Sequence, residues 1–288
     1  MKFFARLAAT LLTTTFAVLP TFAQPFNDSD VPFVVTPDNV TMEMLKLAGV
    51  GPNDALLDLG SGDGRIVILA ARRFGARGLG VEIVPGLVEK SQANARAAGV
   101  SDRAEFRVQD LFKTDLTQAS VITMYLLPEV NLQLRPALLA LKPGTRLVSH
   151  DWDMGEWQPD RTVTVDVPDK PIGREKLSRL HLWVVPAQVA GLWCGVGELR
   201  NYSVELAQKF QQFDGALRQQ VGRRQQARSL SGRIAGSVLQ ASSVTAASST
   251  AARLQIELKD ETLRVVEADG DLADLRGMAL RRPTGGRC

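Results

Sequence analysis

The sequence predicts an α/β protein with a doubly wound, Rossmann-like seven-stranded sheet, helices on both faces and a small C-terminal β-rich module. Three observations support this prediction. Short apolar runs alternate with helical patterns between residues 55 and 150, which is typical of parallel strands joined by helical crossovers. A glycine-rich turn follows the first of these runs. After Pro186 the helical periodicity fades, and short segments separated by glycines take its place.

The bulk composition indicates a folded chain. It has 288 residues, of which 45% are hydrophobic, enough to bury a sizeable core. The net charge of +3 does not by itself indicate a nucleic-acid partner. Arginines cluster between residues 218 and 233, and a solvated face is the favoured interpretation of this basic segment. Cys194 and Cys288 lack metal-ligand spacing, so one disulfide bridge and two free thiols are both open.

The first 23 residues have the pattern of a secretory signal peptide. Lys2 and Arg6 precede an apolar run over residues 7–19, and small residues then lead to Gln24. The run is short for a membrane span, which needs about 20 apolar residues, but an uncleaved anchor is the alternative. We therefore expect an exported, periplasmic protein or one anchored to a membrane through this run. Residues 1–23 are left out of the predicted fold.

Residues 24–54 are predicted to form a lead-in and an N-terminal helix. Three early prolines keep the first part of this segment extended. Apolar residues at helical spacing from Val40 to Leu47 predict the helix, with Thr36 or Asp38 as its N-cap.

Residues 55–186 are predicted to form the α/β domain. The expected parallel strands span residues 55–59, 78–83, 104–108, 120–125 and 146–150. The expected helices span residues 65–74, 86–98 and 130–141. Two further runs, at residues 162–167 and 180–185, are candidates for the last two strands, as an antiparallel pair at one edge of the sheet.

Residues 187–288 are predicted to form the β-rich module. Apolar residues roughly alternate with polar ones from Val204 to Phe210, as in a half-buried strand. A helix over residues 202–221 is a competing interpretation, because Gln, Lys and Leu are good helix formers. Residues 241–252 are nearly all Ala, Ser and Thr and predict a loop, and residues 281–288 predict a loose tail.

The turn after the first predicted strand carries the clearest functional signal. It has the sequence Asp58-Leu59-Gly60-Ser61-Gly62-Asp63-Gly64. A strand, a tight turn and a helix N-terminus let backbone N–H groups approach a ligand. A dinucleotide loop places its third glycine one residue later, and the acids of this turn would repel a pyrophosphate. They suit a ligand that carries positive charge, such as an amino group and a sulfonium.

Two more acids follow the next two predicted strands. Glu82 and Ile83 end the second strand, and Asp110, Leu111 and Phe112 follow the third. Because the carboxyl ends of parallel strands meet at one edge of a sheet, these residues are expected to lie beside the glycine turn. Glu82 is suited to accept hydrogen bonds from a ribose diol, and Asp110 from an adenine amine. The alternative is that these acids only cap strand ends.

Together these residues resemble motifs I, II and III of the class I S-adenosylmethionine-dependent methyltransferases. The resemblance covers roughly residues 31–185. It implies that S-adenosyl-L-methionine is the cofactor. The residues that it assigns to cofactor binding are Thr36, Asp58, Gly60, Ser61, Gly62, Gly64, Glu82, Ile83, Asp110 and Leu111.

More locally, the chain is similar to the lysine methyltransferase family that includes the ATP synthase c-subunit lysine N-methyltransferase and its bacterial relatives. The segments that carry this similarity are Pro32–Pro37, Asp58–Ile66 and Thr123–Pro128 with Asn131. The resemblance implies N-methylation of a lysine in a protein substrate. It also implies a hydrophobic N-terminal segment, which residues 7–19 are suited to provide.

The chemistry that this resemblance implies is an in-line displacement at a sulfonium carbon, for which the enzyme mainly aligns the reacting groups. Tyr125, at the end of the fourth predicted strand, is placed to form an aromatic wall for the amine, and Asn131 to bond substrate or cofactor. A core position for Tyr125 and a helix-terminal role for Asn131 are the alternatives. Phe33 and Thr36 are expected to close over the cofactor.

No metal site or further catalytic group is predicted. Neither His150 nor His181 has metal partners at suitable spacing. His150 and Asp151 are interpreted as strand-end capping groups rather than as two residues that act together as a general base. Two other functions are open on the same motifs. One is methylation of a small molecule or lipid, and the other is a non-catalytic exported binding protein that has kept the cofactor loop.

Overall fold

The computed structural model describes residues 34–170, 175–245 and 248–288 and, of residues 244–251 within these ranges, the backbone only. The expected signal peptide or anchor and Phe33 lie outside the described residues. Within the described ranges, every helix is too short or too polar to cross a membrane.

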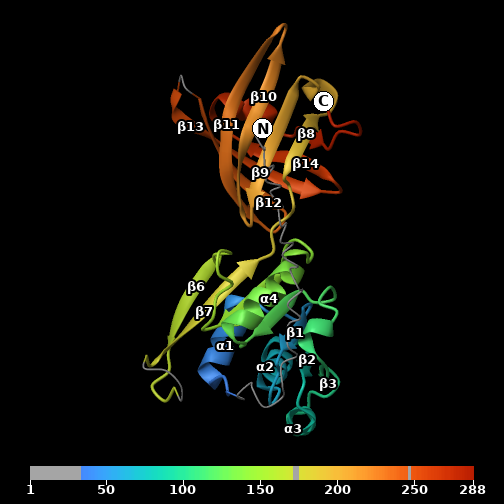
Figure 1. Ribbon diagram of the computed structural model, residues 1–288, viewed down its shortest axis with the longest axis vertical. Coiled ribbons are helices and arrows are strands. Elements are labelled where there is room, and N and C mark those ends of the chain that lie inside the picture. The colour runs from blue at the N-terminus through green and yellow to red at the C-terminus, as the bar shows by residue number, and fades with distance from the viewer. Residues whose placement is uncertain (1–33, 171–174, 246–247) are drawn as a thin grey trace, which may run out of the picture. The chain divides into compact units, whose positions relative to one another are not determined.

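A seven-stranded sheet forms the first half of the described chain (Figure 1), with the order β3-β2-β1-β4-β5-β7-β6. The strands are β1 (Ala55–Leu59), β2 (Arg77–Glu82), β3 (Ala104–Val108), β4 (Val121–Met124), β5 (Arg146–His150), β6 (Arg161–Asp166) and β7 (Leu177–Val184). The first five run parallel, and β7 is antiparallel to both β5 and β6. The structure therefore confirms the doubly wound sheet and the antiparallel pair at its edge.

Helices pack on both faces of this sheet. They are α1 (Asp38–Leu47), α2 (Arg65–Leu69), α3 (Pro85–Ala97) and α4 (Pro128–Leu139). Adjacent residues of β1 point into separate cores. Leu56 lies in one core with Val40 of α1, and Leu57 lies in the other with Leu134 of α4. Strands that are buried on both faces read as continuous apolar runs, and for this reason the sequence pattern located them.

The N-terminus of α1 differs from the prediction. Pro37 is the N-cap residue, and neither Thr36 nor Asp38 forms a capping hydrogen bond there. The Thr36 hydroxyl lies instead 3.4 Å from Nδ1 of His150, and a proline at the N-cap has no side-chain acceptor to offer.

The helix predicted over residues 65–74 also changes character along its length. It is α-helical over Arg65–Leu69 and continues as a π-helical turn over Ala70–Phe74. Gly75 then ends it with a φ of 70°, a conformation that glycine adopts without steric cost. The wide last turn brings the chain directly into β2.

The chain after Pro186 forms a closed eight-stranded antiparallel barrel. Its strands are β8 (Gly191–Gly195), β9 (Tyr202–Lys209), β10 (Gln212–Val221), β11 (Arg224–Ala235), β12 (Val238–Thr245), β13 (Ser248–Lys259), β14 (Thr262–Ala268) and β15 (Ala279–Arg281). Each strand pairs with the next in sequence, and β15 closes the barrel onto β8. Trp193, Leu206 and Phe213 are among the apolar side chains that fill the interior.

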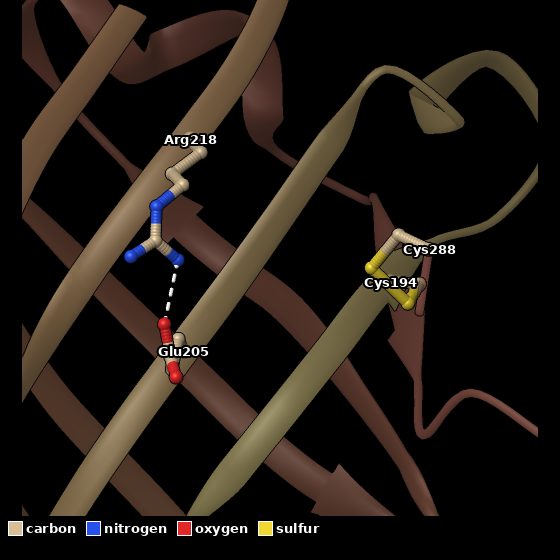
Figure 2. The surroundings of a disulfide bond; sticks show 4 residues. All are labelled: Cys194, Glu205, Arg218 and Cys288. Carbon is tan, nitrogen blue, oxygen red and sulfur yellow. Dashed lines mark hydrogen bonds and ion pairs between the residues drawn. A yellow bond between two sulfur atoms is a disulfide. The ribbon is translucent and has the colours of Figure 1, made fainter. Parts of the chain in front are cut away.

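The structure confirms the β-rich module and corrects three details. Strands β9 and β10 occupy residues 202–221, so the competing helix is wrong. The described residues of the Ala, Ser and Thr segment, 241–245 and 248–252, lie in β12 and β13 rather than in a loop, because barrel ladders use backbone groups that these small residues supply equally well. The tail at residues 281–288 is fastened, because Cys288 is bonded to Cys194 (Figure 2).

This disulfide lies at the seam where the barrel closes. Strands β15 and β8 pair through two registered residue pairs, fewer than at any other junction of this barrel. The guanidinium of Arg282 also lies 4.3 Å from the ring centroid of Trp193 and donates a hydrogen bond to the carbonyl of Ala190. The bridge and this cation–π contact therefore hold the last strand against the first.

The basic segment between residues 218 and 233 is largely neutralised. Three of its arginines form ion pairs: Arg218 with Glu205 (Figure 2), Arg228 with Asp271 and Arg233 with Asp160. The segment is nevertheless a solvated face, as predicted, because Arg223 and Arg224 are exposed and the ion-paired side chains are partly exposed.

Candidate active site

The glycine turn between β1 and α2 requires its glycines. Gly60, Gly62 and Gly64 have φ angles of 74°, 53° and 81°, which other residues rarely adopt. A Cβ on Gly64 would lie 2.6 Å from Cβ of Ser91 and 2.7 Å from Cζ of Phe106. The turn therefore packs directly onto α3 and β3, and no side chain separates its glycine backbone from a ligand.

Glu82 is tied to this turn. Its Oε2 accepts a hydrogen bond from the N–H of Gly62 at 3.0 Å, and its Oε1 accepts from the N–H groups of Ile83 and Val84 at 2.8 and 3.1 Å. A carboxylate offers about four acceptor positions, and three are used here. The expected contact with a ribose would therefore share this carboxylate with the backbone of the turn.

Asp58 is the buried acid of the site. It is 2% exposed, and the hydroxyl of Thr123 donates a 2.7 Å hydrogen bond to its Oδ1. Burial, with smaller contributions from the charges of Glu82 and Asp63, raises the pKa of Asp58 to about 7 against the lowering effect of the Thr123 bond. A carboxyl in this setting favours a ligand that brings positive charge, which fits the amino group and sulfonium of the expected cofactor.

Asp63, in contrast, is neutralised within the turn. Arg65 donates two hydrogen bonds to its carboxylate, at 2.7 and 2.9 Å. Burial alone would raise the pKa of Asp63, but these bonds and the Arg65 charge hold it below its usual value. Arg65 also donates to the carbonyl of Thr36 at 2.9 Å, which brings the lead-in segment against the turn. In the described part of the chain, Asp58 and Glu82 are the acids of this site that form no ion pair.

The third acid lies beside exposed apolar side chains. Oδ1 of Asp110 accepts a hydrogen bond from the N–H of Phe112 at 2.9 Å and so caps the short 3-10 helix Leu111–Lys113. Phe112 and Ile83 are 39% and 45% exposed, although both are large apolar residues. Apolar side chains left open next to a carboxylate suit a flat heterocycle that is apolar on its faces and polar at its edge.

Tyr125 follows β4 and lines a cavity. Its ring lies against His150, with centroids 3.9 Å apart and planes inclined by 32°. Burial and the charge of Asp151 raise the pKa of Tyr125, so its hydroxyl stays protonated at neutral pH. The cavity is lined by Val34, Val35, Pro37, Tyr125, His150, Lys170 and Ser178.

His150 is buried in the wall of this cavity. It is 1% exposed, with Ser178 Oγ 2.8 Å from its Nε2 and Thr36 Oγ1 3.4 Å from its Nδ1. Burial lowers its pKa to about 4, against the opposing attraction of Asp151. The imidazole is therefore neutral at pH 7, and it supports the Tyr125 ring. No sequence pattern indicates Ser178 and Lys170 as cavity residues, because they come from β7 and the segment before it.

Asn131 does not line this cavity. Its side chain is 0% exposed, and Nδ2 donates hydrogen bonds to Ser149 Oγ at 3.2 Å and to the carbonyls of Trp152 and Asp153, both at 3.3 Å. It therefore joins α4 to the segment after β5. Its Oδ1 is buried without a hydrogen-bond partner among the described residues, and the expected contact of Asn131 with substrate or cofactor stays a prediction.

A sheet of this order, with a glycine turn after β1 and acids at the ends of β1, β2 and β3, defines a class I S-adenosylmethionine-dependent methyltransferase. Known proteins agree with this class. The family model of the ANTKMT methyltransferase domain matches residues 58–161. A protein-lysine N-methyltransferase of Saccharolobus islandicus is 42% identical over 138 residues, which are 47% of this chain and 86% of that protein. The chain therefore belongs to the ANTKMT-related family of class I methyltransferases.

Other relatives match a similar share of the chain. The ATP synthase c-subunit lysine N-methyltransferase of Mus musculus is 35% identical over 156 residues, which are 53% of this chain and 62% of that protein. The crystal structure of an RNA methyltransferase from Salinibacter ruber with S-adenosyl-L-homocysteine is 52% identical and covers 54% of this chain and 96% of that one, at a TM-score of 0.49. The matched family model ends before β8, so the barrel lies outside it.

Proposed function

We propose that this methyltransferase transfers the methyl group of S-adenosylmethionine to the side-chain nitrogen of a lysine in a protein. The observation that carries the proposal is the cavity at the end of β4, where the Tyr125 ring lies tilted against a neutral His150 beside Asp151. An aromatic wall next to a carboxylate is suited to an alkylammonium group. The names of the lysine-methylating relatives from Saccharolobus islandicus and Mus musculus support this choice of acceptor.

The bound cofactor supplies an electrophilic methyl group on a sulfonium. The chain's own residues would hold it at the edge of the sheet. Asp58 and the glycine turn would face its positively charged amino acid part, and Glu82 its ribose. Asp110, with Ile83 and Phe112, would take the adenine. Two observations fit a ligand of this kind: Ile83 and Phe112 expose apolar side chains, and the buried hydroxyl of Ser61 has no hydrogen-bond partner among the described residues.

The acceptor lysine must reach the methyl group as a neutral amine. Tyr125 would orient it through its ring face, because an amine and the cation that forms from it both favour an aromatic face. His150 carries no charge at neutral pH and so adds no repulsion to the approaching nitrogen. These residues align the amine for an in-line displacement, and alignment supplies much of the rate in a reaction whose leaving group is already good.

Incubation of the purified protein with radiolabelled S-adenosylmethionine and cell extract tests the proposal. We expect label in protein, recovered as methyl-lysine after acid hydrolysis. Asp58→Ala should abolish the label, and Asp102→Asn, an exposed acid outside the site, should leave it intact. Label found in the lipid or RNA fraction instead would contradict a lysine acceptor, and no label in any fraction would favour a binding protein.

We also propose that the chain is exported, or anchored to a membrane, through its N-terminal segment. The Cys194–Cys288 bridge supports this proposal, because disulfides persist in oxidising compartments and are rare in the reducing cytosol. N-terminal sequencing of the native protein should then find either Gln24 as the first residue or an intact segment in the membrane fraction. A full-length chain in the cytosolic fraction would contradict the proposal.

A further inference from the structure

Asp151 holds an unusual position directly after β5. Its φ is 63°, a left-handed conformation that non-glycine residues adopt mainly where surrounding structure enforces it. Strand β7 enforces it here. The N–H of Asp151 donates to the carbonyl of Arg179 at 2.7 Å, and its Oδ1 accepts from the N–H of Arg179 at 3.0 Å. One carboxylate oxygen is thus fixed by the backbone, and Oδ2 is left for another partner.

That partner is the ammonium group of a lysine. Nζ of Lys170 lies 2.6 Å from Oδ2 of Asp151 and donates a 2.6 Å hydrogen bond to the carbonyl of Leu177. The Lys170 side chain is 13% exposed, although lysine side chains are almost never so buried unless paired. It lines the same cavity as Tyr125 and His150.

Lys170 is the charged partner of Asp151 Oδ2, because the other basic groups nearby are neutral or paired elsewhere. His150 Nε2 lies 3.6 Å from Oδ2, but its pKa of about 4 makes it neutral at pH 7. The guanidinium of Arg179 is directed to Glu175, at 2.8 Å. The charge of Asp151 also acts on Tyr125, which places this carboxylate within electrostatic reach of the aromatic wall. The cavity is therefore lined both by an aromatic ring and by a lysine that is paired with Asp151.

We infer that Asp151 is the subsite for the ammonium group of the acceptor lysine, and that Lys170 is its resident occupant, which the acceptor displaces. The inference rests on the proposed function and adds a binding residue and a competing group to it. An acceptor lysine arrives protonated, because its ordinary pKa is about 10.4. It therefore needs an anionic group at the aromatic wall when it binds, and it has the same ammonium group as the Lys170 side chain that holds this place in the free protein. The bound ammonium must then lose its proton to solvent before the neutral amine attacks the methyl group.

Competition of this kind lowers the apparent affinity for any acceptor. If the subsite is free for a fraction of the time, the apparent Kd is the intrinsic Kd divided by that fraction. Occupancy of about nine-tenths by Lys170 would weaken acceptor binding about ten-fold. A protein that adds contacts around its lysine can overcome this loss, whereas an isolated amine cannot. Competition from Lys170 would thus favour a lysine that is part of a bound protein over a free amine.

An NMR titration with a blocked lysine, Nα-acetyl-lysine N-methylamide, tests the inference on the full chain saturated with S-adenosylhomocysteine. Lys170→Met keeps the length of the side chain and removes its charge, and should bind this probe about ten-fold more tightly than the wild-type chain. Asp151→Asn, which tolerates the same backbone conformation, should lose the binding. Lys170→Arg should behave like the wild type. Lys46→Met, at an exposed lysine on α1, is the matched control and should change nothing.

Two outcomes would overturn the inference: equal affinity in the wild-type and Lys170→Met chains, or undiminished binding in Asp151→Asn. Unchanged S-adenosylhomocysteine affinity shows that each variant is folded. The blocked norleucine analogue, which lacks the ammonium, should not bind. The two experiments fail independently, because this one measures amine binding and the other measures methyl transfer. Failure of the labelling experiment alone would contradict the proposed function and leave the amine-binding result standing. Failure of amine binding alone would contradict this inference and leave the proposed function standing.

Discussion

At the scale of single residues, the protonation of Asp58 is expected to make cofactor affinity depend on pH. Its pKa of about 7 in the free protein means that it is half protonated near neutrality. A cationic ligand favours the ionised form, so protonation competes with cofactor binding. We expect S-adenosylmethionine to bind about ten-fold more weakly at pH 6 than at pH 8. Calorimetry across this range checks the prediction, and an affinity that rises toward pH 6 would contradict it.

The raised pKa of Asp58 also makes the stability of the fold depend on pH, with the greater stability at low pH. The native state holds the proton more tightly than the unfolded chain, whose Asp titrates near 3.8. The stability that this proton contributes is complete below pH 3.8 and is lost as the pH rises through about 7. Three pKa units correspond to about 4 kcal/mol.

Asp58→Asn should therefore stabilise the free protein while it weakens cofactor binding. Asn cannot ionise, and its side-chain oxygen still accepts the hydrogen bond from Thr123. We expect the thermal midpoint to rise by several degrees at pH 8 and by less at pH 5. Calorimetric scans at both pH values measure the two shifts. A gain of equal size at both would show that the buried charge is not its cause.

At the scale of elements, the glycine turn depends on close packing as much as on conformation. Gly64→Ala places a Cβ 2.6 Å from Ser91 in a residue whose φ is 81°. We expect a loss of about 2 to 3 kcal/mol in the free energy of unfolding and a weaker cofactor affinity. Gly86→Ala is the matched control, because no atom lies within 4 Å of its added Cβ and its φ is ordinary. Denaturant unfolding of both variants measures the difference, and equal losses would refute the packing argument.

The strands of the sheet were predictable to within three residues, whereas several features of the barrel and the cavity were not. Strand β1 is an apolar run because both of its faces are buried. The segment at 241–252 has no such run, yet Ala241 and Ala252 face the barrel core, where small residues suffice. Lys170 lies between β6 and β7, and the pairing of these strands places it at the cavity. The local sequence around Lys170 does not indicate this position.

The acids of the cofactor site were predictable for a related reason. They follow strands whose ends must meet at one edge, so sequence position alone fixed their neighbourhood. The stack of Tyr125 on His150 follows the same logic, since β4 and β5 are adjacent, but the two rings were not connected in the prediction. The hydrogen bond from Asn131 to the carbonyl of Trp152 was not predictable, because it depends on the path of the loop after β5.

At the scale of the molecule, the turn between β9 and β10 belongs to the core of the sheet. Phe210 has a φ of 55°, and its ring stacks with Trp157 at 6.2 Å between centroids. The guanidinium of Arg135 lies 5.7 Å from the centroid of the same ring. The alternation from Val204 to Phe210 predicted one continuous strand, but Phe210 leaves the barrel interior and packs with residues around α4.

The barrel and the sheet nevertheless have separate interiors, and the disulfide belongs to one of them. The bridge joins residues 94 positions apart, so in the chain-entropy model it stabilises the closed barrel by about 4 to 5 kcal/mol. Cys288→Ser should lower the unfolding midpoint of the barrel by several degrees, and dithiothreitol should lower that of the wild-type chain equally without affecting the variant. Affinity for S-adenosylmethionine should stay within about two-fold, because the residues assigned to the cofactor lie between Thr36 and Leu111, outside the barrel strands. Calorimetric scans, with and without reductant, and cofactor titrations check both expectations. Parallel loss of barrel stability and cofactor affinity would mean that the two parts unfold as one unit.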